Sequence, residues 1–401
     1  MRTKSKWLVS IISVSLAAVA LAAAGPGYHV VKTYKVGGEG GWDYLTYDTS
    51  GHRVFVSRGN HVMVLDGESG VTLGDIPETL GVHGIALAPD LGRGFTSNGL
   101  ANAITIFDLK TLKPIGQAPT GQNPDAILYD PVSKRVFAFN GRSNNATAID
   151  AASGQPVGTI PLTGNPEFAV TDGKGTVFVN IENKHTLTAI DSQKLSVKSN
   201  WDLPGCEDPS GLSMDLENRR LFAVCSNKLM AIVDADSGRL VTTVPIGAGP
   251  DASAFAPKTG LVFSSNGRDG TLTVVHEDSP DKFTVVANLP TESGARTMAL
   301  DQDTGTVYLV TAAFGPATIL SFILQLFRSV VRPVEVGLAA LFALSFLLWL
   351  MRARNSGRTN KVQWLGGALL FLGITFVVLS WQYDAVIVAL SPKDFRMTIW
   401  R

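Results

Sequence analysis

The feature that most constrains this chain is a repeat of about 42 residues that covers most of its length. A short phrase with an aromatic residue in second place recurs, for example as VFVSRG, VFAFNG and VFSSNG. The aromatic occurs seven times, at intervals of 40 to 45 residues: Phe55, Phe95, Phe137, Phe178, Phe222, Phe263 and Tyr308. A second marker keeps the same period, at Asp66, Asp108, Asp150, Asp191, Asp234 and His276.

Each unit holds short alternating or β-branched runs between turn residues, which predicts about four strands per unit. A period in the low forties with four strands is typical of a propeller blade, so we predict an all-β, seven-bladed β-propeller over residues 25–316. The segments 66–70, 150–154 and 234–238 read D-x-x-S-G. Their aspartates are expected to accept backbone N–H groups in tight turns, which makes these acids structural.

The ends of the repeat predict how the ring closes. Residues 28–44 align with the outer strand and following loop of later units, so the N-terminal strand is expected to complete the last blade. That blade lacks one strand after residues 307–311. Either it is one strand short, or the tail comes from a fusion or a change of reading frame, or a distant segment fills the gap. The strand-like stretch 385–390 (AVIVAL) is the candidate.

The first residues have the pattern of an export signal. Arg2, Lys4 and Lys6 precede an apolar stretch, and Ala22 and Ala24 form an A-x-A site. We expect residues 1–24 to be a signal peptide cleaved after Ala24; the alternative is an uncleaved membrane anchor. In both cases the repeat region leaves the cytoplasm.

Two apolar stretches near the C-terminus predict a transmembrane hairpin, with helices at 333–351 and 362–382. The loop between them, 352–361, has four bases and no acid, which favours the cytoplasmic side. Residues 317–332 are expected to form an interfacial or lead-in helix, and 383–401 a tail on the exported side. The alternative is a buried helical hairpin of a soluble domain. The expected location is a bacterial-type cytoplasmic membrane, with the propeller on its periplasmic or extracellular side.

Charge is unevenly distributed along the chain. The whole sequence has 34 basic and 34 acidic residues, but residues 25–316 contain 22 bases and 31 acids, a net charge of −9. An acidic domain lacks the field that attracts a polyphosphate. Nucleic acid is therefore not an expected partner, whereas the lipid bilayer and a small ligand or an envelope protein are.

Polar residues recur where each innermost strand begins. In a propeller these positions line one mouth of the axial channel. They are Asp43, His83, Asp125, Glu167, Ser210, Asp251 and Arg296. The second turn of each blade is expected on the same face and adds Arg58, Asn98, Asn140, Arg142, Asn266 and Arg268. Carboxylates placed this way suit a hard cation, an amine or a small polar ligand, and crowding would raise some of their pKa values. The alternative is that the mouth of any propeller is polar, with N-x-G turns chosen for their backbone conformation.

Familiar catalytic motifs are missing from the sequence. It contains no G-x-S-x-G, H-E-x-x-H or C-x-x-C-H segment and no P-loop, which argues against hydrolytic or redox chemistry by those routes. We expect no catalytic residue and no cofactor, although a divalent cation such as calcium would suit the acids. Cys206 and Cys225, the two cysteines, are expected on one face in an oxidising environment, which favours a disulfide over two free thiols.

Two segments, 123–163 and 249–275, resemble the YVTN-type β-propeller repeats of YncE-like exported proteins. The resemblance covers residues 28–314 and implies a seven-bladed propeller, an architecture that serves binders and enzymes alike. The leading interpretation is a membrane-anchored binding scaffold that uses its channel mouth. One alternative is a metal-dependent, lactonase-like hydrolase with its metal at Glu167, Asp125 and Asp251. The other is a structural subunit of an envelope complex.

Overall fold

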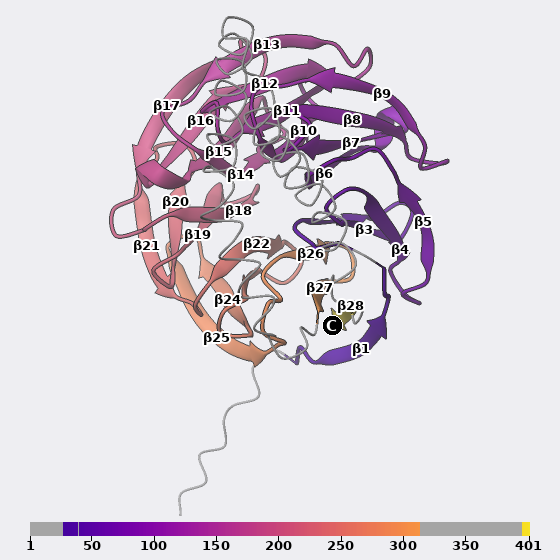
Figure 1. Cartoon of the computed structure of the whole chain (residues 1–401). Coiled ribbons are helices and arrows are strands. Elements are labelled where there is room, and N and C mark those ends of the chain that lie inside the picture. The colour runs from indigo at the N-terminus through magenta and orange to yellow at the C-terminus, as the bar shows by residue number, and fades with distance from the viewer. Residues whose placement is uncertain (1–26, 39, 313–394) are drawn as a thin grey trace, which may run out of the picture.

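In a computed structural model the chain forms a closed ring of small sheets (Figure 1). The structure describes residues 27–38, 40–312 and 395–401. Within these residues, 28 strands form seven four-stranded antiparallel sheets. Sheets that neighbour each other along the chain also pack against each other, and the seventh packs against the first. The seven-bladed β-propeller expected from the repeat is confirmed.

The strands of each blade run from the channel outward. Blade 1 contains β2 (Leu45–Asp48), β3 (Arg53–Ser57), β4 (Val62–Asp66) and β5 (Thr72–Ile76). Blade 2 contains β6 (Val82–Ala88), β7 (Arg93–Asn98), β8 (Ala103–Asp108) and β9 (Pro114–Pro119). Blade 3 contains β10 (Pro124–Asp130), β11 (Arg135–Asn140), β12 (Asn145–Asp150) and β13 (Pro156–Pro161). Blade 4 contains β14 (Pro166–Thr171), β15 (Thr176–Ile181), β16 (Thr186–Asp191) and β17 (Ser196–Asp202).

The remaining blades follow the same order. Blade 5 contains β18 (Pro209–Asp215), β19 (Arg220–Cys225), β20 (Leu229–Asp234) and β21 (Leu240–Pro245). Blade 6 contains β22 (Pro250–Ala256), β23 (Leu261–Asn266), β24 (Thr271–Ser279) and β25 (Lys282–Pro290). Blade 7 contains β26 (Met298–Asp301), β27 (Thr306–Ala312), β28 (Phe395–Trp400) and β1 (Val30–Lys35). Two short 3₁₀ helices, η1 (Pro89–Leu91) and η2 (Glu182–Lys184), lie in loops.

The repeating aromatics form the core between blades. All seven lie on the second strand of their blade and are at most 3% exposed. A side chain at this position faces the neighbouring sheet, so each aromatic contributes to a contact that a single blade could not make. The sequence period therefore records the packing of one blade on the next.

The turn aspartates have the structural role expected from the sequence. Asp150 accepts the backbone N–H and the hydroxyl of Ser153, each at 2.7 Å, and Asp66 binds Ser69 in the same way at 2.7 and 2.6 Å. These hydrogen bonds stabilise the ionised carboxylate and lower the pKa of both aspartates. The turns join the third and fourth strands, at the end of the ring opposite the starts of the inner strands.

Ring closure follows the expected plan at one end of the chain and departs from it at the other. β1 completes blade 7, as expected, but it pairs with a distant strand, β28, which pairs in turn with β27. In Figure 1 yellow β28 lies between orange β27 and indigo β1. A distant segment thus fills the gap, but it is Phe395–Trp400 rather than 385–390, which lies outside the described residues. The propeller therefore extends beyond residues 25–316.

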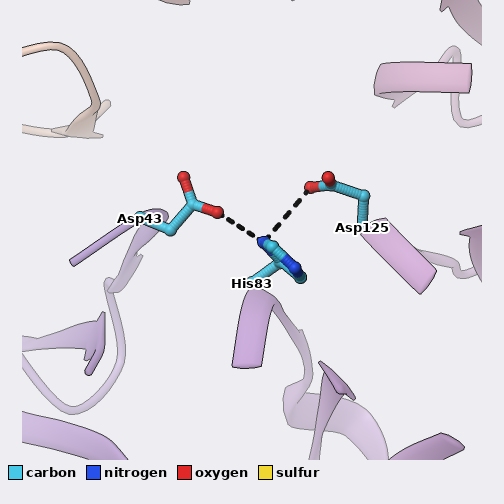
Figure 2. A group of neighbouring side chains, drawn as sticks. All are labelled: Asp43, His83 and Asp125. Carbon is cyan, nitrogen blue, oxygen red and sulfur yellow. Dashed lines mark hydrogen bonds and ion pairs between the residues drawn. The ribbon is translucent and has the colours of Figure 1, made fainter. Parts of the chain in front are cut away.

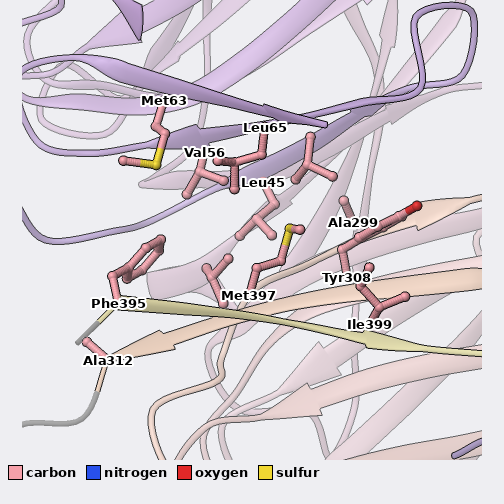
Figure 3. Packing of buried hydrophobic residues seen from close by; sticks show 12 residues of the cluster. Leu45, Val56, Met63, Leu65, Ala299, Tyr308, Ala312, Phe395, Met397 and Ile399 are labelled. Atoms are coloured by element: carbon pink, nitrogen blue, oxygen red, sulfur yellow. The ribbon is translucent and has the colours of Figure 1, made fainter. Parts of the chain in front are cut away.

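The side chains of β28 explain why this segment is used. FRMTIW alternates, so Phe395, Met397 and Ile399 all point into the core between blades 7 and 1 (Figure 3). There they pack on Leu45, Val56 and Leu65. The uniformly apolar stretch 385–390 has no such polar and apolar face.

The segment between β27 and β28 begins and ends at the channel mouth. Ala312 and Phe395 are direct cross-strand partners, at the end of blade 7 where the inner strands begin. The expected signal peptide (1–24), lead-in helix (317–332), transmembrane helices and cytoplasmic loop lie outside the described residues. Among the residues that are described, no helix is long and apolar enough to cross a membrane.

Candidate ligand-binding site at the channel mouth

The seven residues expected at the mouth stand at equivalent positions, one per blade. We call Asp43, His83, Asp125, Glu167, Ser210, Asp251 and Arg296 the mouth ring. Each lies at the start of an inner strand or in the loop just before it. Side chains of Asp43 and Asp125 are 21% exposed and that of His83 29%, so the groups are in reach of solvent but largely desolvated. The structure brings most of this ring together through ion pairs and shared burial.

A repeated hydrogen bond positions the ring. A hydroxyl or amide two residues after a landmark aromatic donates to the backbone carbonyl of the ring residue in the next blade. Ser97 donates to the carbonyl of Asp125 and Ser265 to that of Arg296. Asn180 donates to that of Ser210 at 2.8 Å. We did not single out these positions from the sequence, although their fixed offset from Phe95, Phe263 and Phe178 was a usable signal.

Three ring residues from blades 1 to 3 converge on one point. His83 Nδ1 lies 2.6 Å from Asp43 Oδ2 and 3.8 Å from Asp125 Oδ1 (Figure 2). Burial disfavours the charged form of His83, but the hydrogen bond to Asp43 and the charge of Asp125 outweigh it and raise the pKa of the imidazole. Burial also raises the pKa of Asp125, although the positive charge of His83 opposes that change.

Arg296 supplies the other positive charge of the ring. Its guanidinium bridges two carboxylates, with Nη2 2.9 Å from Asp43 Oδ1 and Nη1 3.0 Å from Asp251 Oδ2. Burial raises the pKa of Asp251 to about 7, and Asp43 and Asp125 add to this while Arg296 opposes it. Asp43 is therefore shared between Arg296 and His83 and links the two halves of the ring.

Glu167 has no basic residue as a partner in the described part of the chain. It accepts a long hydrogen bond from Asn165 Nδ2, at 3.4 Å, and the same amide binds Glu182 more closely, at 2.8 Å. Burial, followed by the charges of Asp125 and Glu182, raises the pKa of Glu167 to about 9. At neutral pH this carboxyl is protonated. Glu182, on η2, is an acid of the mouth that we did not expect from the sequence.

An aromatic pair spans the channel next to the ring. Tyr44 of blade 1 stacks on Phe168 of blade 4, with ring centroids 4.5 Å apart. Blades 1 and 4 are not neighbours, so this contact crosses the channel. The Tyr44 hydroxyl is buried and has no hydrogen bond of ordinary geometry in the described structure. Burial, then the charges of Asp125 and Glu167, raise its pKa well above the usual value. We call the mouth ring together with this aromatic pair the mouth cup.

The second-turn asparagines are engaged within their own blades. Asn98, Asn140 and Asn266 are at most 1% exposed. Their amides donate to Thr105, Thr147 and Thr273, each one strand outward, at 2.8 to 2.9 Å. The structure does not bring these side chains to the ring.

The remaining expected residues divide between buried and exposed places. Arg58 is fully buried, with its guanidinium 3.6 Å from the ring centroid of Phe395, so it helps to hold β28. Arg142 and Arg268 are exposed. The Ser210 hydroxyl donates to the carbonyls of Pro250 and Asp251 at 3.3 and 3.4 Å, so it joins blades 5 and 6.

Cys206 and Cys225 form a disulfide that spans 19 residues of sequence. Cys206 lies in the loop before β18 and Cys225 ends β19, so the link lies on the mouth face of blade 5. Both residues are at most 3% exposed.

Solved structures of propeller proteins resemble this fold. The chain is similar to Kuenenia stuttgartiensis hydrazine synthase, with a TM-score of 0.61 and 16% identity, over 68% of this chain and 92% of that chain. It is also similar to a chain of a mitotic checkpoint complex, with a TM-score of 0.63 and 14% identity, over 77% and 96%. The WD40 repeats of RRP9 give a TM-score of 0.60 and 10% identity, over 72% and 90%. No family model and no curated protein sequence matches the chain. At these identities the likeness shows the fold alone, so the class is a seven-bladed β-propeller of WD40-like architecture.

Proposed function

We propose that this protein is a binding module that recognises a small positively charged ligand in the mouth cup, and that it belongs with the YncE-like exported propellers. The observation that carries the proposal is the imbalance of the ring. Among the described residues, Asp43, Asp125, Glu167 and Asp251, joined by Glu182, have only Arg296 and His83 as cationic partners. Without a ligand, these acids are neutralised by bound protons and in part by Arg296 and His83. A cation that enters the cup would take over this neutralisation.

The aromatic pair of the mouth cup supports the binding of a cation. The Tyr44–Phe168 pair lies across the channel, next to the ring. An aromatic face beside a ring of carboxylates suits a protonated amine or a metal ion.

The ends of the described chain support membrane attachment with the mouth toward the bilayer. Both ends of the 313–394 segment emerge at the mouth face, and this segment contains the expected hairpin. Tyr28 lies on the opposite face, where its hydroxyl donates to the carbonyl of Gly305 at 2.8 Å. An uncleaved leader would start from that opposite face. After cleavage at Ala24, the propeller would be attached to the membrane through its mouth face alone. A fluorophore at Arg142→Cys should be quenched by headgroup quenchers in proteoliposomes more strongly than one at Glu217→Cys.

Ligand-induced thermal stabilisation of the full chain in detergent tests the binding function. The probes are spermidine, Mn²⁺, Zn²⁺ and Ca²⁺, each titrated separately. A ligand present at 100 times its Kd stabilises the folded state by about 2.7 kcal/mol, which is readily measured. The variant with Asp125→Asn, Glu167→Gln and Asp251→Asn should lose the response. A control with Glu68→Gln, Glu217→Gln and Asp303→Asn removes three exposed acids from the opposite face and should keep it.

The same variants separate the other functions. A hydrolase would show metal-dependent turnover of a lactone panel that the mouth variant abolishes. A structural subunit would co-purify with its envelope partners whether or not the mouth acids are present. Absence of any response to all four probes would refute the proposal.

A further inference from the structure

We propose that Asp43, His83 and Asp125 form a binding site for one divalent transition-metal ion. This site rests on the proposed cation-binding function and specifies the ligand class for one sector of the cup. One imidazole nitrogen and one oxygen from each carboxylate lie within 4.8 Å of one another. These atoms come from equivalent positions in three consecutive blades, so the ring geometry itself makes them converge (Figure 2).

The backbone holds the two carboxylates in place before any ion arrives. The carbonyl of Asp125 accepts the Ser97 hydroxyl of blade 2, and that of Asp43 accepts the Thr297 hydroxyl of blade 7. Arg296 binds Asp43 through Oδ1 and leaves Oδ2 directed at His83. Hydrogen bonds of this kind to the outer atoms of ligands orient them and are typical of metal sites.

A missing side chain provides the space for the imidazole. A Cβ atom at Gly99 would lie only 2.7 Å from His83 Nε2. Glycine here therefore lets the His83 ring lie flat against the loop with Nδ1 turned to the acids.

The donor set favours a transition metal over calcium. One imidazole with two carboxylates suits Zn²⁺ or Mn²⁺, whereas Ca²⁺ takes six to eight oxygen ligands. Three protein ligands leave coordination positions for water or for a further ligand in the cup. The site differs from the Glu167, Asp125 and Asp251 set considered from the sequence, because among the described residues the ligand atoms that lie within 4.8 Å of one another are those of Asp43, His83 and Asp125.

Isothermal titration of the metal-stripped full chain in detergent with Zn²⁺, Mn²⁺ and Ca²⁺ tests the site. We expect one Zn²⁺ per chain, bound at least tenfold more tightly than Ca²⁺. His83→Ala and Asp125→Asn should each weaken Zn²⁺ binding more than tenfold. Glu217→Gln is the control, since it removes an exposed acid on the opposite face, and it should change the affinity less than threefold. Absorption at the Zn K edge should show one imidazole in the coordination shell.

The outcomes separate this site from the general function. If cations bind equally well to His83→Ala, or if Ca²⁺ equals Zn²⁺, the triad site is refuted while the cation-binding mouth stands. If no metal binds but spermidine does, the triad site is likewise refuted and the cation-binding mouth stands. If no cation binds at all, both proposals fall. Gly99→Ala provides a variant that keeps all three ligands, and it should weaken Zn²⁺ binding by displacing the His83 ring. Circular dichroism of each variant establishes that the propeller is intact.

Discussion

Acidic residues on the two faces of the propeller differ in how the fold changes their pKa values. On the face of the outer turns, Asp66 and Asp150 accept backbone N–H groups, which lower their pKa values. At the mouth, burial and neighbouring carboxylates raise the pKa values of Glu167 and Asp251 to about 9 and about 7. The turn acids stabilise the ring when they are charged, whereas the mouth acids cost stability when they are charged. Carboxyl groups whose pKa values are raised in this way are typical of functional sites, which supports a ligand-binding site at the mouth.

The largest effect should come from removing the strand that holds both faces together. A chain that ends at Asp394 lacks β28 and with it four buried core side chains, whose burial is worth about 1.5–3 kcal/mol each. Since a domain is stable by only about 5–15 kcal/mol, we expect no folded propeller, as measured by limited proteolysis and near-ultraviolet circular dichroism. Both faces should be lost together.

Point substitutions in β28 give a graded version of that test. Met397→Ala should destabilise the fold by about 2–5 kcal/mol, because the side chain is fully buried. Thr398→Ala, on the other side of the strand, should change the unfolding free energy by less than 1 kcal/mol. Equal stability of the shortened and full-length chains would show that β28 is not part of the ring.

The disulfide should matter next, and on one face only. Replacing both cysteines by alanine removes a link that closes a loop of 19 residues, worth about 3 kcal/mol in the chain-entropy account. Hydrogen exchange should increase in the loop at 205–209 at the mouth and stay unchanged in the turn at 234–238. Faster exchange at both places would mean that the two faces are not independent.

The pH dependence of stability should distinguish the faces directly. For Glu167 and Asp251 the folded pKa is raised, so their contribution is full below about pH 4 and is lost as the pH rises through about 9 and about 7, respectively. For the turn aspartates the folded pKa is lowered, so their contribution is present above pH 4 and is lost on acidification. Stability should therefore fall at both ends of the pH range, for different reasons.

Glu167→Gln should flatten the alkaline side of this profile. The amide cannot ionise, so the variant should melt a few degrees higher than the parent at pH 9 and within about 1 °C of it at pH 5. Thermal unfolding at both pH values measures the difference. A fall in melting temperature at pH 9 would contradict the assignment of Glu167 as a buried, protonated acid.

The smallest effect should come from a single turn. Asp150→Ala removes two hydrogen bonds to Ser153 at an exposed position, which should cost about 1 kcal/mol at pH 7 and nothing near pH 2. Asp251→Asn at the mouth is the matched substitution and should leave stability unchanged or increase it at pH 8. Chemical unfolding at these pH values gives the comparison.

Much of the fold followed from the sequence because it rests on short-range patterns. The 42-residue period and its aromatic are local patterns that every blade repeats, and the D-x-x-S-G turn recurs in three of the seven blades. The mouth ring also followed from register alone, since its members occupy one position per repeat. The alternation of FRMTIW also marks 395–400 as a candidate strand, but we assigned the missing strand of blade 7 to the apolar run 385–390.

Only the tertiary structure decided which side chains meet. The stack of Tyr44 on Phe168 joins blades on different sides of the channel, and no spacing along the chain predicts a contact across an axis. Likewise, Asp43 pairs with both Arg296 and His83 only because ring closure brings blade 7 beside blade 1. The repeat set the position of each residue within its own blade, whereas closure of the ring by β28 and β1 set the distances between blades, and those distances determine the charges and the chemistry of the mouth.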